Sequence, residues 1–159
     1  MKIKNIPKLV YSIVICQLAG IIGAFFTSPS ISTWYAALEK PSFNPPNWLF
    51  SPVWITLFIL MGISLYLIWS QGTKTKYFKI AITFFGIQLA LNILWSIIFF
   101  GLKSPFFAFI EIVILWIAIL ATIFKFSKIS KTAAYLLIPY LLWVSFAAVL
   151  NFSIWVINL

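Results

Sequence analysis

Long apolar stretches alternate along the chain with short segments that carry lysines. Five stretches are free of charge apart from a single glutamate, and they are residues 9–38, 41–73, 80–102, 104–124 and 132–159. A helix needs roughly 20 apolar residues to cross the hydrocarbon core of a bilayer, which is about 30 Å thick. Each stretch is long enough, so the pattern predicts five membrane-spanning helices.

The predicted spans lie near residues 9–27, 52–70, 80–101, 105–124 and 133–156. They take up most of the chain and leave short connections, apart from an ordered loop at 28–51 that is rich in proline and tryptophan. The expected fold is therefore an all-α integral membrane protein, a five-transmembrane-helix bundle that forms a single domain over residues 1–159.

The lysines separate onto two faces if the five spans alternate in direction. One face receives those before the first span, between the second and third, and between the fourth and fifth: Lys2, Lys4, Lys8, Lys74, Lys76, Lys79, Lys125, Lys128 and Lys131. The other face receives Lys40 and Lys103, and Glu39 offsets the first of these. Because lysine is concentrated on the cytoplasmic side of membrane proteins, this distribution predicts a cytoplasmic N-terminus and a C-terminus outside.

The composition excludes a soluble globular domain, because 64% of the residues are hydrophobic and 8% are charged. The net charge of +9 comes from lysine alone, whereas base and phosphate recognition favours arginine. We therefore expect contacts with anionic lipid headgroups, with the lipid bilayer as a partner and no nucleic acid. Basicity from lysine alone, with abundant Ile and Phe, favours a prokaryotic source and thus its cytoplasmic (inner) membrane.

The chain has one cysteine, Cys16, and no histidine. A single cysteine excludes an internal disulfide. Histidine, which is the commonest metal ligand and the usual axial ligand of haem, is missing. We expect no metal site and no resident cofactor. The lysine-rich start and first span look like a signal peptide, but residues 24–30 make a poor cleavage site, so we expect the span to be retained.

The first loop differs from the rest of the chain, because residues 28–53 hold five of its eight prolines. Proline fixes φ and disfavours helix at the preceding residue, so the loop is predicted to be stiff and extended. A short helix over 33–39, capped by Ser32 or Thr33, fits its centre. The loop either covers a cavity as a lid or forms an interfacial aromatic belt, and both interpretations fit.

Four motifs follow one another along the chain. They read WYxxLxKPxFxPPxWxFxPVW over 34–54, MGxSxYLxW over 61–69, LNxxWSxxFF over 91–100 and PYxxWxxFAxxLN over 139–151. In these residues and their spacing the chain resembles the TspO/MBR family, also called translocator proteins, tryptophan-rich sensory proteins or peripheral benzodiazepine receptors. The resemblance covers about residues 15–157. It implies five membrane helices, in agreement with the charge distribution.

Polar side chains recur on one face of the third predicted span. Gln88, Asn92 and Ser96 are spaced four residues apart, with Trp95 beside them. A polar group in hydrocarbon is costly unless it faces the bundle interior or a cavity. Such groups often only join helices, at about 0.6 kcal/mol each. On the residues alone, joining helices and lining a pocket both remain open.

Two other spans present aromatic faces, composed of Trp54, Phe58, Met61 and Leu65, and of Tyr140, Trp143, Ala147, Asn151 and Ile154. If the three faces converge, they line an aromatic pocket for a flat hydrophobic ligand. Its expected hydrogen-bond donors are Trp54, Trp143, Asn92 and Tyr35. The resemblance implies such a cavity beneath the first loop. At the matching positions its ligand-binding residues are Tyr35, Pro45, Trp54, Phe58, Asn92, Trp95, Trp143, Ala147 and Leu150.

Glu111 is the one charge inside a predicted span. It is either a proton or ligand counter-ion, or a neutral, hydrogen-bonded carboxyl inside the bundle, and we favour the second interpretation. Two pairs of small residues, Ala19 with Gly23 and Gly86 with Ala90, suit close helix packing. The resemblance implies a homodimer built partly on the third span, which the second pair suits.

The resemblance and the predicted pocket favour a membrane receptor or binding protein for porphyrins, such as protoporphyrin IX and haem-related tetrapyrroles, acting in sensing, sequestration or transport. The alternative is an enzyme that degrades porphyrin in light and oxygen. The pocket offers no nucleophile–base pair, metal set or phosphate loop, so that reaction would be photochemical, with Trp54 and Trp143 as its catalytic residues. A third interpretation is a proton-coupled exporter that uses Glu111.

Overall fold

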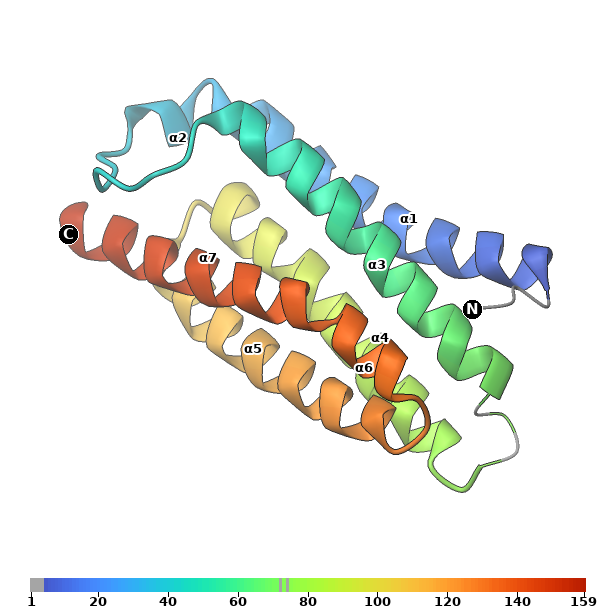
Figure 1. Ribbon diagram of the computed structural model, residues 1–159. Helices are drawn as coiled ribbons and strands as arrows, with labels where there is room; N and C mark the ends of the chain where they lie inside the picture. The colour runs from blue at the N-terminus through green and yellow to red at the C-terminus, as the bar shows by residue number, and fades with distance from the viewer. Residues whose placement is uncertain (1–4, 72, 74) are drawn as a thin grey trace.

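The computed structural model describes residues 5–71, 73 and 75–159. Within these residues, five helices are long and apolar enough to cross a membrane, and they form one bundle (Figure 1). Their bounds are α1 Ile6–Ile31, α3 Phe50–Gln71, α4 Phe78–Ser96, α5 Pro105–Ser127 and α7 Ile138–Ile157. The predicted all-α, five-helix membrane fold is confirmed. The orientation of the termini stays a prediction, and Lys2, Lys4 and Lys74 lie outside the described residues.

Shorter elements connect the long helices. The helix α2 (Trp34–Ala37) and the 3₁₀ turn η1 (Asn47–Leu49) lie between α1 and α3, and α6 (Lys131–Leu136) leads into α7. The π-helical turn η2 (Ile97–Gly101) continues α4. Such turns disturb the regular spacing of a helix and often occur at functional sites. Here η2 turns two phenylalanine rings into the interior.

Local sequence explains where the helices begin. The Asn5 side chain accepts a hydrogen bond from the Lys8 amide at 3.0 Å, and Pro7 follows in the first turn, where its missing N–H has no helical partner to lose. Ser130 caps α6 in the same way, by accepting from the Ala133 amide at 3.4 Å. Each long helix then continues through an apolar segment.

The first helix is longer than predicted, because α1 runs through Pro29 to Ile31. The expectation of an extended loop from residue 28 is therefore wrong. Proline removes one hydrogen-bond donor from a helix, but here it lies in the last turn, where little helix remains to be disrupted. The Thr33 hydroxyl donates to the Pro29 carbonyl at 2.9 Å. Thr33 precedes α2 as its N-cap, but because its hydroxyl bonds to Pro29, its side chain caps no amide of α2. The helix α2 is also shorter than the predicted helix.

Small residues allow α1 to approach its neighbours closely. A Cβ at Gly62 of α3 would lie 2.6 Å from the Cα of Ile13, so the backbones of α1 and α3 nearly touch there. A Cβ at Gly23 would lie 3.0 Å from the Ser96 hydroxyl of α4. A Cβ at Gly86, in contrast, would meet no described atom within 4 Å. Gly86 therefore lies on an open outer face of α4.

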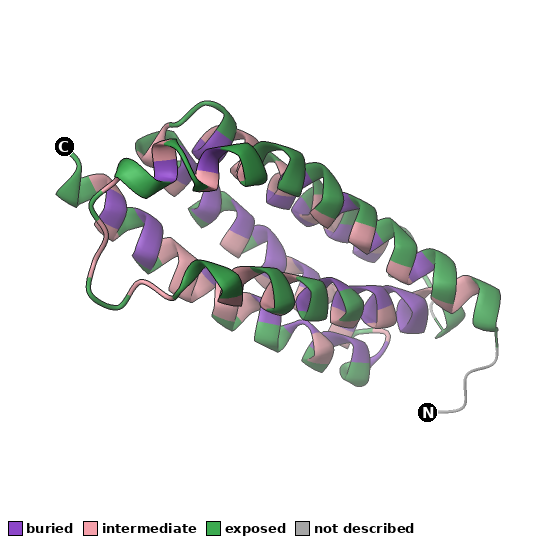
Figure 2. Cartoon of the chain, turned by 90° about the horizontal axis from the view of Figure 1, so that it is seen from above, coloured by how far each residue is buried: buried purple, intermediate pink, exposed green. Residues whose placement is uncertain are grey.

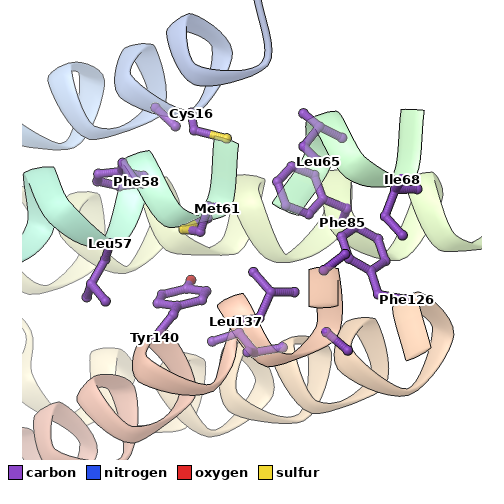
Figure 3. Packing of buried hydrophobic residues seen from close by; sticks show 14 of the residues in the cluster. Cys16, Leu57, Phe58, Met61, Leu65, Ile68, Phe85, Phe126, Leu137 and Tyr140 are labelled. Atoms are coloured by element: carbon purple, nitrogen blue, oxygen red, sulfur yellow. The ribbon is translucent and has the colours of Figure 1, made fainter. Parts of the chain in front are cut away.

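The buried residues, purple in Figure 2, recur along the helices of the bundle. Met61 and Leu65 belong to this core, and Phe85 of α4 stacks on Phe126 of α5 with ring centroids 5.6 Å apart. Figure 3 shows the ring of Tyr140 between α7 and α3, pointing toward Met61. The half of the bundle farthest from the α1–α3 loop is thus filled by packed side chains.

Residues 32–49, here called the lid, fold over the end of the bundle that carries the C-terminus (Figure 1). The Asn158 amide group, just after α7, donates to the Glu39 carbonyl at 2.9 Å, and the Asn158 side-chain oxygen accepts from the Glu39 amide at 3.0 Å. Nearby, the Ser30 hydroxyl donates to the Phe100 carbonyl at 3.0 Å and joins the end of α1 to η2. Hydrogen bonds therefore hold the lid to the bundle at Glu39, and the end of α1 just before the lid is held at Ser30.

Gly62→Ala should destabilise the bundle. The added methyl group would overlap the backbone of Ile13, and overpacking of this kind costs about 1–3 kcal/mol. The matched control is Gly86→Ala, whose methyl group enters open space. Thermal unfolding in detergent should show a lower midpoint for Gly62→Ala than for Gly86→Ala. Equal midpoints would contradict the close contact between α1 and α3.

Asn158→Ala should loosen the lid without disturbing the helices. It removes both bonds to the Glu39 backbone, and hydrogen bonds contribute about 0.5–1.5 kcal/mol each. The loss of about 1–3 kcal/mol should accelerate amide exchange in the lid roughly five- to 150-fold. Hydrogen–deuterium exchange measures this change. Ser153→Ala is the control, because that hydroxyl bonds to the Val149 carbonyl of its own helix. Unchanged exchange in the lid would show that Asn158 does not hold it.

Candidate ligand-binding site

A cavity of about 370 Å³ lies beneath the lid, between α1, α3, α4 and α7. Small-molecule sites typically measure about 300–1,000 Å³, so this cavity lies within their range. Its lining is largely apolar, with polar atoms at a few points. The cavity is confined to the lid end because core side chains such as Phe85 and Phe126 fill the other half of the bundle.

The cavity brings together residues that the sequence assigns to a ligand site. The predicted residues that line it are Tyr35, Trp54, Phe58, Asn92, Trp95, Trp143, Ala147 and Leu150. Pro45 is not among the described residues of the lining, and its carbonyl accepts a hydrogen bond from the Asn44 side chain instead. Asn47 and Phe50, further along the same segment, reach the cavity. The assignment of Pro45 to the ligand site stays a prediction.

Two of the four expected donors are already engaged by the protein. The Asn92 side-chain N–H donates to the Tyr140 hydroxyl oxygen at 3.0 Å, and the Tyr35 hydroxyl donates to the Asn44 side-chain oxygen at 3.0 Å. The Asn92 amide oxygen accepts no hydrogen bond from the described residues, which leaves it as an acceptor for a ligand. Asn92 therefore offers the cavity its side-chain oxygen as an acceptor in addition to the second N–H of its amide.

The indole N–H of Trp143 is buried and lacks a hydrogen-bond partner among the described residues. The ring itself is well held, because Phe50 meets it edge-on at 5.9 Å and Phe146 lies 5.5 Å away. A buried donor without an acceptor is costly, so its persistence needs an explanation. Since Trp143 lines the cavity, an acceptor atom on a bound molecule would satisfy it.

Aromatic rings form a continuous wall beneath the lid. Trp95 stacks on Phe99 with ring centroids 5.1 Å apart, and Phe99 meets Phe100 edge-on at 4.8 Å. Tyr35 of the lid packs on both phenylalanines, at 6.2 and 5.7 Å. The π-helical turn makes this possible, because it directs the adjacent Phe99 and Phe100 into the interior. The wall suits stacking against a flat ring system.

A hydrogen-bond chain fixes the back of the site. The Trp95 indole N–H donates to the Asn151 side-chain oxygen at 3.1 Å, and the Asn151 amide donates to the Pro105 carbonyl at 2.8 Å. These bonds join α4, α7 and the start of α5. Asn151 therefore combines the two roles considered for polar side chains in the spans, because it joins helices and also lines the cavity.

The wall supplied by α1 was not predicted. It includes Gln17, Gly20, Gly23 and Thr27, spaced three or four residues apart on one face of the helix. The Gln17 side chain donates to the Ile55 carbonyl of α3 at 3.1 Å. That spacing of small and polar residues could have indicated that this face of α1 lines a cavity. Small residues are common in membrane helices whatever they face, however, so the spacing alone does not identify a cavity wall.

Tyr35 contributes a neutral hydroxyl to the cavity wall. Burial raises the pKa of the Tyr35 hydroxyl above its ordinary value, although the bond to Asn44 opposes the shift, so Tyr35 is neutral at physiological pH. The Lys40 ammonium lies over the Tyr35 ring at 4.8 Å on the lid. Within the described ranges 5–71, 73 and 75–159, no group of three His, Cys, Asp or Glu side chains is placed to hold a metal ion.

Known proteins are similar to this sequence along nearly the whole chain. The family described as TspO/MBR matches residues 12–156. The chain is 49% identical to the tryptophan-rich protein TspO of Archaeoglobus fulgidus, over 97% of this chain and 99% of that protein. It is 46% identical to the tryptophan-rich protein TspO of Chlorobaculum tepidum, over 98% of each. It is 37% identical to the translocator protein of Bos taurus, over 87% of this chain and 83% of that one.

These matches agree with the motifs read from the sequence and with the five apolar helices of the structure. They cover both the lid and the helices that line the cavity, since residues 12–156 include all of them. The chain is therefore an integral membrane protein that belongs to the TspO/MBR family.

Proposed function

We propose that the protein is a membrane receptor or binding protein for porphyrins, including protoporphyrin IX and haem-related tetrapyrroles, and for similar flat hydrophobic ligands. The observation that carries the proposal is a largely apolar cavity in which the Trp143 indole N–H has no partner among the described residues. A porphyrin offers a broad aromatic face and carboxylate or ring-nitrogen acceptors. Binding would serve sensing, sequestration or transport in the cytoplasmic membrane of a prokaryote.

Apolar burial would supply most of the affinity. Each Å² of apolar surface removed from water contributes about 25 cal/mol, and stacking on aromatic rings adds to it. The ring wall of Trp95, Phe99 and Phe100 is ready for this contact. Trp143 and the Asn92 oxygen would then orient the polar edge of the ligand.

The lid supports the proposal because contacts within the protein hold it over the cavity. Tyr35 and Asn47 of the lid contribute to the cavity wall, while the pair of bonds between Asn158 and Glu39 fastens the lid from outside. A preorganised lid lowers the conformational entropy lost on binding. The covered cavity also keeps the ligand from water.

The open face of α4 supports a homodimer as the assembled form. Gly86 and Ala90 are both exposed there, and no described atom lies within 4 Å of a Cβ at Gly86. Small residues at this spacing let two membrane helices approach closely. The cavity faces the opposite side of α4, where Asn92 and Trp95 lie, so a dimer through this face leaves the cavity accessible.

A second candidate function is light- and oxygen-dependent degradation of the bound porphyrin. It is favoured by the position of Trp54 and Trp143 in the same cavity wall. Trp54 also meets Tyr140 edge-on at 6.2 Å, which gives a second oxidisable ring nearby. Light would excite the porphyrin, an indole would donate an electron, and dioxygen would be the terminal oxidant.

Trp143→Phe should weaken porphyrin binding in the dark. The substitution keeps an aromatic ring but removes the N–H donor, and loss of one hydrogen bond of about 0.5–1.5 kcal/mol raises Kd roughly three- to tenfold. Quenching of tryptophan fluorescence by protoporphyrin IX measures the affinity, because Trp54 and Trp95 remain as reporters in the cavity. Trp155→Phe is the control, since Trp155 packs with Phe106 and Phe109 away from the cavity. If protoporphyrin IX causes no saturable quenching in the unmodified protein, the proposed function is overturned.

Illumination in air tests the second candidate function. The same protein–porphyrin mixture should yield a new absorbing product, and both Trp54→Phe and Trp143→Phe should reduce its yield while Trp155→Phe does not. A porphyrin spectrum that bleaches identically with and without protein would exclude the enzymatic interpretation and leave binding intact.

A further inference from the structure

The end of the bundle opposite the lid carries an excess of positive charge. The starts of α1 and α4, the end of α5 and the helix α6 lie there (Figure 1). Both acidic side chains of the protein are distant, because Glu39 belongs to the lid and Glu111 precedes Lys125 by about four turns of α5, or about 21 Å. No carboxylate side chain therefore neutralises the described lysines at this end, which are Lys8, Lys76, Lys79, Lys125, Lys128 and Lys131.

Two of these lysines lie over aromatic rings on one face of α4. The Lys125 ammonium of α5 lies 5.7 Å from the ring centre of Phe84, and the Lys76 ammonium lies 5.2 Å from the ring centre of Tyr77. Tyr77 immediately precedes α4 and has helical backbone angles. It lies about two helical turns before Phe84, so both rings project from the same face of the helix. This face thus presents two rings roughly 10 Å apart along its axis, each with an ammonium group.

Ring stacking fixes how α4 and α5 lie relative to each other at this level. Phe85 of α4 stacks on Phe126 of α5 with ring centroids 5.6 Å apart, and each is next in sequence to a member of the Phe84–Lys125 pair. The two helices are antiparallel (Figure 1). Lys128, one turn after Lys125, therefore lies about 4.5 Å closer to the level at which α4 begins. A third lysine is thus placed at a depth between the two ammonium–ring pairs.

Exposed apolar side chains continue from these lysines toward the middle of the bundle. Ile80 lies between Tyr77 and Phe84 on the same face of α4 and is 42% exposed, and Ile87, which is 46% exposed, extends that face by a further turn. Phe124 of α5, beside Lys125, is also exposed. Ammonium groups at the end of an apolar strip match the layout of a phospholipid, whose charged headgroup lies at the surface and whose acyl chains lie deeper.

We propose that Lys76, Lys125 and Lys128 bind a phospholipid with two phosphate groups where α4 and α5 meet. Cation–π contact holds two of the ammonium groups at defined positions, which reduces the side-chain freedom lost on binding. One phosphate is too small to contact groups placed two helical turns apart, whereas two phosphates joined by a glycerol bridge engage both. The site assigns the lipid to one pair of helices, which general attraction of anionic lipid to a positive end does not. It is independent of the ligand in the cavity.

Native mass spectrometry of the protein in detergent with added lipid tests the site. The probes are diphosphatidylglycerol, which has two phosphates, phosphatidylglycerol, which has one, and zwitterionic phosphatidylcholine. One diphosphatidylglycerol should stay bound per chain, with a Kd roughly fivefold lower than that of phosphatidylglycerol, because a second phosphate gains a further lysine contact. Phosphatidylcholine should bind more weakly than both. Equal Kd values for the two anionic lipids would overturn the proposal.

Lysine variants separate a defined site from diffuse attraction. Lys76→Gln and Lys125→Gln should each raise the Kd of diphosphatidylglycerol roughly fivefold, since each removes one contact to phosphate. The matched control is Lys8→Gln, because the Lys8 ammonium lies at the same end of the bundle and also over a ring, 5.5 Å from the centre of Trp69. The control should leave the Kd unchanged. An equal rise for Lys8→Gln would show that only the total charge matters and would contradict the site.

Phe84→Leu tests the aromatic ring at constant charge. The substitution removes the ring that positions the Lys125 ammonium, so the Kd of diphosphatidylglycerol should rise roughly two- to fivefold. Phe107→Leu is the control, because that ring is exposed at the lid end of α5. The thermal unfolding midpoint of each variant checks that the bundle is intact. The proposal is wrong if Lys125→Gln and Phe84→Leu both bind diphosphatidylglycerol as tightly as the unmodified protein.

Discussion

Polar side chains inside this bundle have no bulk water to replace a missing partner, and that constraint organises the structure. The Asn92 side chain donates to Tyr140, and Trp95 donates to Asn151, which in turn donates to the Pro105 carbonyl. Each of these bonds joins two helices. Apolar contact alone contributes little to such docking, because lipid tails are as apolar as the helix surfaces. A few interhelical hydrogen bonds therefore fix where α4, α5 and α7 lie relative to one another.

The same bonds keep the cavity open and decide its chemistry. They hold Trp95 and Asn92 in its wall while using their N–H groups within the protein, so the site offers few free donors. The indole N–H of Trp143 differs from these, because it is buried in the described wall, its ring is packed, and it has no partner. The lid adds a second constraint, since its tie to Asn158 holds Tyr35 over the aromatic wall. An apolar hollow with a fixed roof and one unsatisfied donor suits a rigid ring with an acceptor at its edge.

The number and type of the helices could be predicted from sequence, because span length and lysine spacing are direct consequences of the bilayer. The end of α1 could not, since whether Pro29 stops a helix depends on how much helix follows it. Most of the cavity wall followed from the resemblance, whereas Pro45 lies outside the wall because the path of a loop is set by tertiary contacts. The partners of Asn92 and Tyr35 within the protein could not be predicted for a related reason: a sequence does not show which polar groups satisfy each other.

The central claim is that a flat ring compound occupies the hollow beneath the lid. Anomalous diffraction from crystals grown with a metal-substituted protoporphyrin tests it most directly, because the metal marks the ring centre without reference to any side chain. The account predicts one strong peak among Trp54, Asn92 and Trp143, with the lid closed over it. A peak on the lipid-facing surface, with the interior closed by side chains, would contradict the account.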